Sequence, residues 1–386
     1  MQFETWWLLA VPIIFALGWM AARIDLTELL HESKQLPRSY FNGLNFLLND
    51  QPDRAIEAFI EVVKLDPETI ELHFALGSLF RRRGETERAI RVHRNLLERS
   101  DLPVEFRDEA LFSLAQDYLK AGLLDRAEAS FKQLSQTPYA PRAWRFLSEL
   151  YQIESEWPSA IHAATQVILH AKETVEPKEH AKIQRELAHF WCELAQQALA
   201  RKDWTATRTA LTNARNADSE LMRIVQIEIA LGQACGETEQ ALEQIRQAQK
   251  KDPSFASQLA PLLIQLQAST PSENARRLER WFDANPCASL ASAVLEQWRL
   301  AGDNVAADAF VSHALEKAPT LATSALVLKQ RFSESVADPD LRRINALVAD
   351  VVSRERSYEC HHCGFRAKQF YWQCPGCKHW ETLPYG

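Results

Sequence analysis

The sequence contains few glycines, and its net charge is negative. Only 11 of its 386 residues are glycine, whereas Ala, Leu, Glu, Gln and Arg are common, and this balance indicates a mostly helical chain. The formal net charge is −7. Because phosphate contacts demand a basic surface, this charge argues against a general nucleic-acid binder.

Cysteines are too unevenly placed for a secreted disulfide framework. Three of the seven, Cys192, Cys235 and Cys287, are scattered through helical sequence, where we expect them to be small core residues. The other four form two tight pairs near the C-terminus. This distribution fits a reducing compartment and one metal site.

Charge is absent altogether from residues 5–22. Eighteen residues at about 1.5 Å each reach roughly 27 Å, barely enough to cross the hydrocarbon core of a membrane. Trp6, Trp7 and Trp19 lie near the ends, where amphipathic rings prefer the interface. We therefore predict a single transmembrane helix within residues 1–24, with a buried core helix as the alternative.

The charges around this segment predict its fate and its orientation. No basic leader precedes it, as a cleavable signal peptide would need, so we expect a permanent anchor. Arg23, Lys34 and Arg38 follow it. Basic residues mark the cytoplasmic side of a membrane helix, so the bulk of the chain is expected in the cytoplasm.

Residues 36–67 carry the spacing of one tetratricopeptide repeat (TPR), a hairpin of two antiparallel helices. Such helices pack closely only where each has a small residue, and here Gly43 and Ala55 stand at those offsets. Phe46 and Phe59 are expected to fill the space beside the crossing. A single hairpin cannot bury its apolar face, so further copies must stack on it.

Three further copies follow, and the second begins 34 residues after the first, which is the usual TPR length. Their anchors are Gly77, Phe80 and Ala89; Ala115, Tyr118, Ala127 and Phe131; and Ser148, Tyr151, Ala160 and Ala164. We predict an all-α helical solenoid with repeats 1–4 in residues 36–174. Its concave surface suits peptide or helix binding.

The period breaks after the fourth copy. From Ala160 to its counterpart Thr207 is 47 residues, 13 more than one repeat. Residues 172–179 read as a charged connection, and residues 180–201 as an unusually long helix. We interpret residues 175–335 as a long-helix insertion that reorients the array, followed by degenerate repeats.

Arginines gather at the end of the first helix of the second repeat, at Arg81, Arg82 and Arg83. One interpretation is that they complement the helix dipole on a solvated face. The other is a basic patch for an acidic partner or for anionic lipid head groups.

A last amphipathic helix is predicted in residues 336–357, and it runs almost directly into Tyr358. No Gly/Ser linker intervenes. We therefore expect the C-terminal module, residues 358–386, to be docked on the array rather than tethered to it.

This module contains the motifs Cys360-x-x-Cys363 and Cys374-x-x-Cys377. Each motif presents two thiolates from one tight turn, and two facing turns make a tetrahedral four-sulfur site. Four cysteines at this spacing strongly predict one structural metal ion, because so small a module has no core to fold around otherwise. A redox dithiol is the alternative.

The identity of the metal is open between zinc and iron, and zinc is favoured in the cell. The turns look like the knuckles of rubredoxin, but only ten residues separate Cys363 from Cys374, and Lys378 stands where the second knuckle usually has glycine. His361 and His362 lie inside the first turn, and His379 follows the second. We expect these histidines to be exposed rather than ligands.

The order of anchor, TPR array and terminal rubredoxin-like or zinc-ribbon module resembles the lipopolysaccharide assembly protein B family. The resemblance covers essentially the whole chain, and its most specific part is YECHHCGF…CPGC at the C-terminus. Cys360, Cys363, Cys374 and Cys377 match that family's metal ligands position by position.

The resemblance implies an adaptor at the cytoplasmic face of a Gram-negative inner membrane. Such an adaptor helps the membrane protease FtsH to degrade the lipid A deacetylase LpxC, and it works beside other inner-membrane lipopolysaccharide proteins. We find no nucleophile–base pair, phosphate loop or open metal site, so we do not predict an enzyme. The alternatives are a membrane-tethered scaffold for lipopolysaccharide enzymes and a metal or redox sensor with a TPR binding surface.

Overall fold

The computed structural model describes residues 51–65, 70–171, 177–266, 269–331, 339–354 and 358–385, together with residues 15, 16, 19, 42, 43, 45, 46 and 49. The predicted anchor at residues 5–22 lies outside the described residues, except for Phe15, Ala16 and Trp19. No helix in the described part of the chain is both long enough and apolar enough to cross a membrane.

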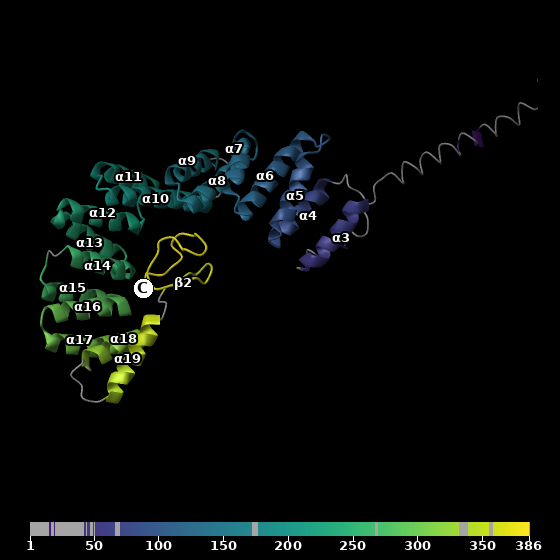
Figure 1. The fold of residues 1–386 in the computed structure, drawn as a ribbon. Helices are drawn as coiled ribbons and strands as arrows, with labels where there is room; N and C mark the ends of the chain where they lie inside the picture. Colours follow the sequence, from purple (N-terminus) through teal and green to yellow (C-terminus); the bar gives the residue numbers. More distant parts are fainter. Residues whose placement is uncertain are drawn as a thin grey trace, which may run out of the picture. The chain divides into compact units, whose positions relative to one another are not determined.

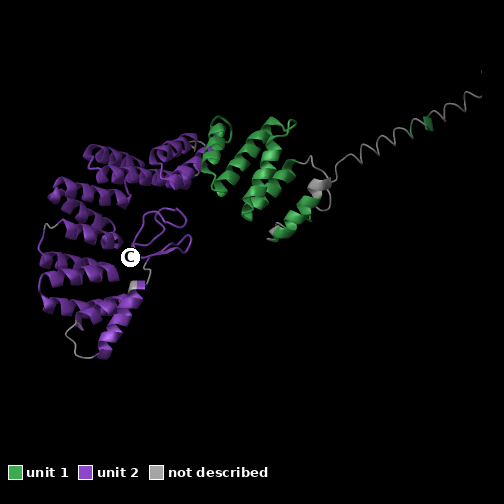
Figure 2. Ribbon diagram, in the orientation of Figure 1, with its two compact units in different colours: residues 1–139 green, residues 140–386 purple. Residues whose placement is uncertain are grey.

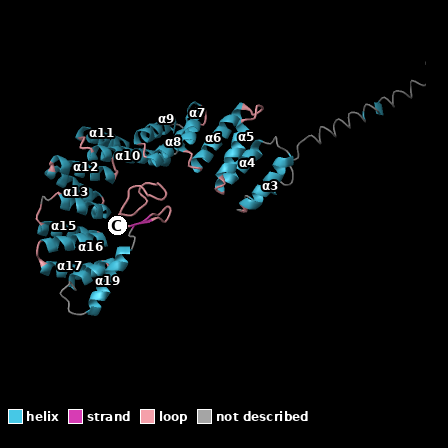
Figure 3. Cartoon of the chain, viewed as in Figure 1, coloured by secondary structure: helices cyan, strands magenta, loops and turns pink. Residues whose placement is uncertain are grey.

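The chain forms two compact units, residues 1–139 and residues 140–386 (Figure 2). Both are built from consecutive helices joined by short turns (Figure 3). The first unit contains α3 (Pro52–Leu65), α4 (Ile70–Arg82), α5 (Thr86–Leu97), α6 (Val104–Lys120), α7 (Leu124–Gln133) and a 3₁₀ turn, η1 (Leu134–Gln136).

The second unit continues the helical hairpins and ends in a small β module (Figure 1). Its helices are α8 (Ala140–Glu154), α9 (Trp157–Ala171), α10 (Pro177–Ala200), α11 (Trp204–Ala217), α12 (Met222–Cys235), α13 (Thr238–Lys251), η2 (Pro253–Phe255), α14 (Ala256–Gln265), α15 (Pro271–Ala284), α16 (Ala288–Leu300), α17 (Asn304–Lys317), α18 (Leu321–Arg331) and α19 (Pro339–Arg354). Two short strands follow, β1 (Tyr358–Glu359) and β2 (Arg366–Ala367). For these residues the structure confirms the expected all-α TPR solenoid, followed by a small C-terminal module of a metal-binding kind.

Small residues mark the helix crossings, as the repeat spacing predicts, but their neighbours differ from those expected. A Cβ atom on Gly77 would lie 2.4 Å from the ring of His93, so the nearest neighbour is His93 and not Ala89. On Gly43 it would lie 2.6 Å from the ring of Phe59. In these two hairpins glycine makes room for a ring, because an aromatic side chain reaches across the crossing.

A buried polar cluster accounts for His93. Its Nδ1 lies 2.5 Å from Oδ2 of Asp117, and both side chains are fully buried. Arg81 completes the cluster, because its guanidinium donates to Oδ1 of Asp117 at 2.7 Å and to the carbonyl of Ser113 at 3.1 Å. A buried carboxylate is tolerated only when it is paired in this way.

Two members of the arginine cluster take part in ion pairs within the first unit. Arg81 is bound to Asp117, and Arg83 forms ion pairs with Asp53 at 2.7 Å and with Glu85 at 3.0 Å. These two cations are therefore engaged inside the first unit. Arg81 links α4 to α6, and Arg83 links the turn after α4 to α3.

The three scattered cysteines lie in or beside the helical core. Cys192 is fully buried on α10, and burial raises the pKa of its thiol to about 12. Cys235 and Cys287 are half-buried and pack against the same kind of apolar cluster. The expected core role is confirmed for Cys192, whereas Cys235 and Cys287 lie at the edge of the core. α10 itself spans 24 residues, and its inner face carries the side chains that receive the C-terminal module.

We predict that Gly77→Ala destabilises the first unit by about 1–3 kcal/mol, the usual cost of overpacking a core. The new methyl group must displace the His93 ring and so disturb its contact with Asp117. Thermal unfolding of the purified chain measures the effect.

Gly232→Ala is the matched control, because it also lies inside a helix but its Cβ would meet that of Ala241 at 3.3 Å. This variant should lose little stability, because alanine favours the helix over glycine by up to about 1 kcal/mol. Equal unfolding temperatures for Gly77→Ala and the parent chain would show that His93 does not need this space.

Candidate metal centre

Two turns with the same hydrogen bonds form the C-terminal module. In the first, Cys360 N–H donates to the carbonyl of Phe365 at 2.8 Å, and Gly364 N–H donates to that of Cys360 at 2.9 Å. In the second, Cys374 N–H donates to His379 at 2.8 Å, and Lys378 N–H donates to Cys374 at 2.9 Å. The antiparallel strands β1 and β2 flank the first turn. Each turn therefore closes around its own cysteine pair.

Equivalent positions in the two turns share an unusual backbone. Gly364 has φ +72° and Lys378 has φ +61°, both in the left-handed region. Glycine adopts this conformation freely, whereas a lysine there is strained by roughly 1–2 kcal/mol. Lysine at this position, where glycine is usual, therefore leaves the geometry of the knuckle unchanged but strains its backbone.

The four cysteines that the spacing predicts come together. Their sulfur atoms all lie within 4.8 Å of one another, with Cys360 and Cys377 3.8 Å apart and Cys363 and Cys374 3.7 Å apart. A tetrahedron with metal–sulfur bonds of about 2.3 Å has edges of about 3.8 Å. The separations are too long for disulfides and suit a four-sulfur metal site.

The electrostatics of the cluster also call for a cation. Burial works to raise the pKa of Cys360, but contacts from the Thr382 hydroxyl and from backbone amides lower it to about 6. Burial and the neighbouring sulfurs raise the pKa of Cys377 to about 12. Four thiolates so close together repel one another, so a metal ion is needed to hold all of them ionised. The donor set fits zinc and iron alike.

Within the second unit, two tryptophans dock the module against the helices, as the missing linker predicts. The indole N–H of Trp372 donates to Gln226 of α12 at 2.8 Å. That of Trp380 donates to Gln152 of α8 at 2.9 Å, and the Gln152 amide donates back to the carbonyl of Lys378 at 2.9 Å. Each indole therefore joins an apolar contact to a fixed hydrogen bond.

Trp380 is held between two buried side chains of the array. The ring of His189, on α10, stacks on it with centroids 4.4 Å apart and an interplanar angle of 12°. The guanidinium of Arg223, on α12, lies 5.3 Å from the indole centroid. Burial lowers the pKa of His189, so this ring is neutral at neutral pH and can stack without a desolvation penalty for charge.

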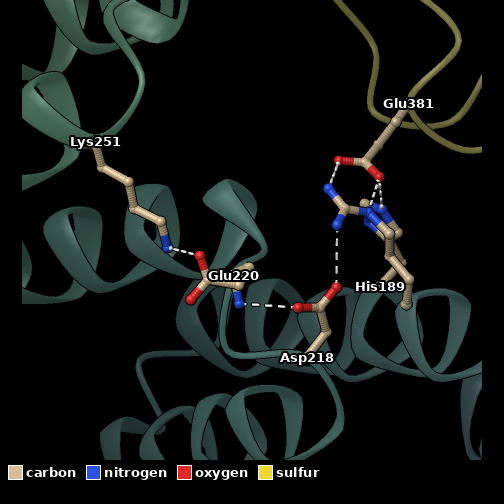
Figure 4. A network of polar contacts seen from close by, with 6 residues as sticks. His189, Asp218, Glu220, Lys251 and Glu381 are labelled. Carbon is tan, nitrogen blue, oxygen red and sulfur yellow. Dashed lines mark hydrogen bonds and ion pairs between the residues drawn. The ribbon is translucent and has the colours of Figure 1, made fainter. Parts of the chain in front are cut away.

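An ion-pair network fixes the module beside this stack (Figure 4). Glu381 forms a two-pronged ion pair with Arg185 of α10, and Arg185 also donates to Asp218 at 3.2 Å. The network extends through Glu220, whose N–H donates to Asp218 at 2.8 Å and whose carboxylate pairs with Lys251 at 2.6 Å (Figure 4). The network thus connects α10, the turn between α11 and α12, α13 and the module.

Burial alone would raise the pKa of Glu381, but the hydrogen bonds from Arg185, with Nε2 of His189 3.6 Å away, overcome that effect and hold it at about 2. A carboxyl whose pKa is lowered by folding stabilises the folded state above its ordinary pKa, here 4.5. That stabilisation is lost as the pH falls from about 4.5 toward 2.

The end of the chain makes a third contact. The carbonyl of Tyr385 accepts from the Ser257 hydroxyl at 2.5 Å and from the Gln258 amide at 2.8 Å. Its ring packs edge-on to Phe255, with centroids 5.0 Å apart. The module therefore rests on α8, α10, α12 and α14 at once.

A cavity of about 370 Å³ lies beside the docked module. Arg145, Glu149 and Glu186 line it from the array, and Lys378 and His379 line it from the module. Arg145 pairs with Glu186 across two helices. The walls therefore carry both signs of charge.

Family models match both parts of the chain. A model described as rubredoxin metal binding domain matches residues 358–384. Two tetratricopeptide repeat models match residues 72–106 and 112–175.

Two curated relatives span nearly the whole chain. Lipopolysaccharide assembly protein B of Escherichia coli K12 is 32% identical over 382 residues, covering 97% of this chain and 96% of that protein. The protein of the same name from Haemophilus influenzae is 27% identical over 397 residues, with the same coverage. Among solved structures, the C-terminal part of a TPR protein from Cytophaga hutchinsonii covers 73% of this chain and 96% of its own, at 11% identity and a TM-score of 0.42.

We predict that Glu381→Gln lowers the stability of the second unit by about 1–2 kcal/mol, between the values for exposed and fully buried ion pairs. The amide cannot neutralise Arg185, so the module's contact with α10 weakens. Calorimetric unfolding of the metal-loaded chain at neutral pH measures the loss.

Glu359→Gln is the control, because Glu359 pairs with Arg366 at 2.9 Å on the exposed side of the same module. It should change the stability by no more than a few tenths of a kcal/mol. If the two variants lose the same amount, the Arg185 pair does not hold the module to the array.

Proposed function

Because the chain belongs to the lipopolysaccharide assembly protein B family, we propose that it is a membrane-anchored adaptor in lipopolysaccharide biosynthesis. The observation that carries the proposal is sequence identity to a relative over nearly the whole chain. This identity includes both the TPR array and the C-terminal module. TPR arrays bind peptides and helices, so the role proposed is binding rather than catalysis.

The four cysteines hold one structural metal ion, and zinc is favoured in the cell. Cys360, Cys363, Cys374 and Cys377 supply a closed set of four thiolates, which leaves no position for a substrate. The ion supplies folding free energy to a module too small to fold alone. Its task is to keep Trp372 and Trp380 in the orientation that meets the array.

The partner surface proposed is the region where array and module meet. The cavity there is lined by charged groups from α8, α10 and the module, including Arg145, Glu149 and Lys378. Burial raises the pKa of Glu149, so this carboxyl gains from a cationic partner. A segment of mixed charge that enters this cavity would contact both parts of the chain and depend on both.

The partners proposed are the protease FtsH and the deacetylase LpxC, which this adaptor brings together at the cytoplasmic face of the inner membrane. Residues 5–22 serve as the single transmembrane anchor. Anchoring beside a membrane protease raises the effective concentration of the bound substrate by about 10²–10⁴-fold without any further contact. Nucleic acid is not a partner, since the net charge is −7.

Two other functions compete with this one. A membrane-tethered scaffold would gather lipopolysaccharide enzymes without changing their turnover. A metal or redox sensor would need an exchangeable ion, whereas Cys360 and Cys374 are buried among the four thiols. The turnover of the deacetylase separates the adaptor from the scaffold, and release of the metal under mild chelation separates either from a sensor.

We predict that deleting the chain lengthens the half-life of LpxC in cells, and that removing residues 1–22 does so too. The truncated array still binds its partners but loses the gain in effective concentration. Pulse–chase measurement of LpxC at matched expression of each variant tests this.

A third variant, in which an unrelated transmembrane helix replaces residues 5–22, is the control. Restored turnover shows that the segment acts by location alone. Unchanged LpxC half-life in the full deletion would contradict the adaptor and favour the scaffold.

A further inference from the structure

Two further metal-ligating side chains, both histidines, gather beside one of the four cysteines of the module. Ligand atoms of His362, His379 and Cys377 all lie within 4.8 Å of one another. The two histidines come from different turns, yet their ring centroids are only 3.9 Å apart. Both are exposed, so an ion can reach them from solvent.

A hydrogen bond fixes the tautomer of one of these rings. Nδ1 of His379 lies 3.0 Å from the carbonyl oxygen of Cys377. A carbonyl can only accept, so Nδ1 carries the proton and Nε2 keeps its lone pair. Metal-binding histidines are commonly fixed in this way, with one ring nitrogen donating to a backbone carbonyl and the other facing the ion.

The thiolate of Cys377 lies between the two sites. It is one corner of the four-sulfur tetrahedron, 3.8 Å from the sulfur of Cys360. It is also the member of that set grouped with His362 and His379. A thiolate sulfur bound to one metal retains lone pairs, so it can bridge to a second.

We propose that His362 and His379 form a second metal site, with the thiolate of Cys377 as a shared third ligand. Two imidazoles and a thiolate select a divalent transition metal such as Zn²⁺ over Mg²⁺ or Ca²⁺, which prefer oxygen ligands. Among the residues that the structure describes, three supply ligands to this site, so water completes the coordination. The ion at this edge exchanges faster than the enclosed one, because it has fewer protein ligands and faces solvent.

The test uses the full chain with its four-cysteine site filled with zinc. Dialysis against buffered Zn²⁺, followed by elemental analysis, gives the zinc bound per chain. We expect a second equivalent in the parent chain and its loss in both His362→Ala and His379→Ala. The retained first equivalent shows that the module is still folded in these variants.

His361→Ala is the matched control, because His361 is exposed in the same turn but is not part of the cluster. It should keep the second equivalent. The proposal is overturned if the parent chain binds no second zinc ion. It is also overturned if the two variants keep that ion, or if His361→Ala loses it equally.

Cobalt tests the shared thiolate. Zinc has a filled d shell and gives no visible bands, so Co²⁺ added to the zinc-loaded chain reports only its own ligands. A thiolate-to-cobalt charge-transfer band is expected in the parent chain and absent in His379→Ala. Cobalt binding at the histidines without that band would overturn the bridging role of Cys377.

Discussion

The mutual repulsion of four thiolates is the constraint on which the C-terminal module and its contacts with the array depend. The sulfurs of Cys360, Cys363, Cys374 and Cys377 lie within 4.8 Å of one another, and only a bound cation allows all four to be ionised together. The module has a very small apolar core of its own. Its shape therefore follows from the metal tetrahedron, and so do the positions of the side chains that it presents to the array.

The array depends on the module in return. His189 and Arg223 are almost completely buried, and both lie against Trp380. Without the module these polar groups would face either water or an apolar gap, and Arg185 would lose Glu381. Removing one partner of a buried polar contact costs more than the contact itself contributes, so array and module stabilise each other. The helices that contact the module and the module itself therefore form one continuous surface.

The sequence predicted whatever depends on local spacing. The TPR period predicted that small residues lie at the helix crossings. The two Cys-x-x-Cys motifs predicted that the four sulfurs lie together. The sequence did not predict which ring faces Gly77, because His93 was not a repeat anchor. Nor did it predict the pair between Arg185 and Glu381, which are 196 residues apart and have no pattern in common. The two tryptophans in so short a module were the available signal for docking, since a large ring that cannot be buried within a small fold must be buried against a neighbour.

The most direct test of this account is hydrogen–deuterium exchange of the full chain with its metal bound and after removal by a chelator. The account predicts that metal loss raises exchange in the module and also in α8, α10, α12 and α14, where Gln152, Arg185, Gln226 and Ser257 contact it. Helices α16 and α17 should change little. Faster exchange confined to residues 358–385, with α10 and α12 unaffected, would contradict the claim that the metal organises the helices that contact the module.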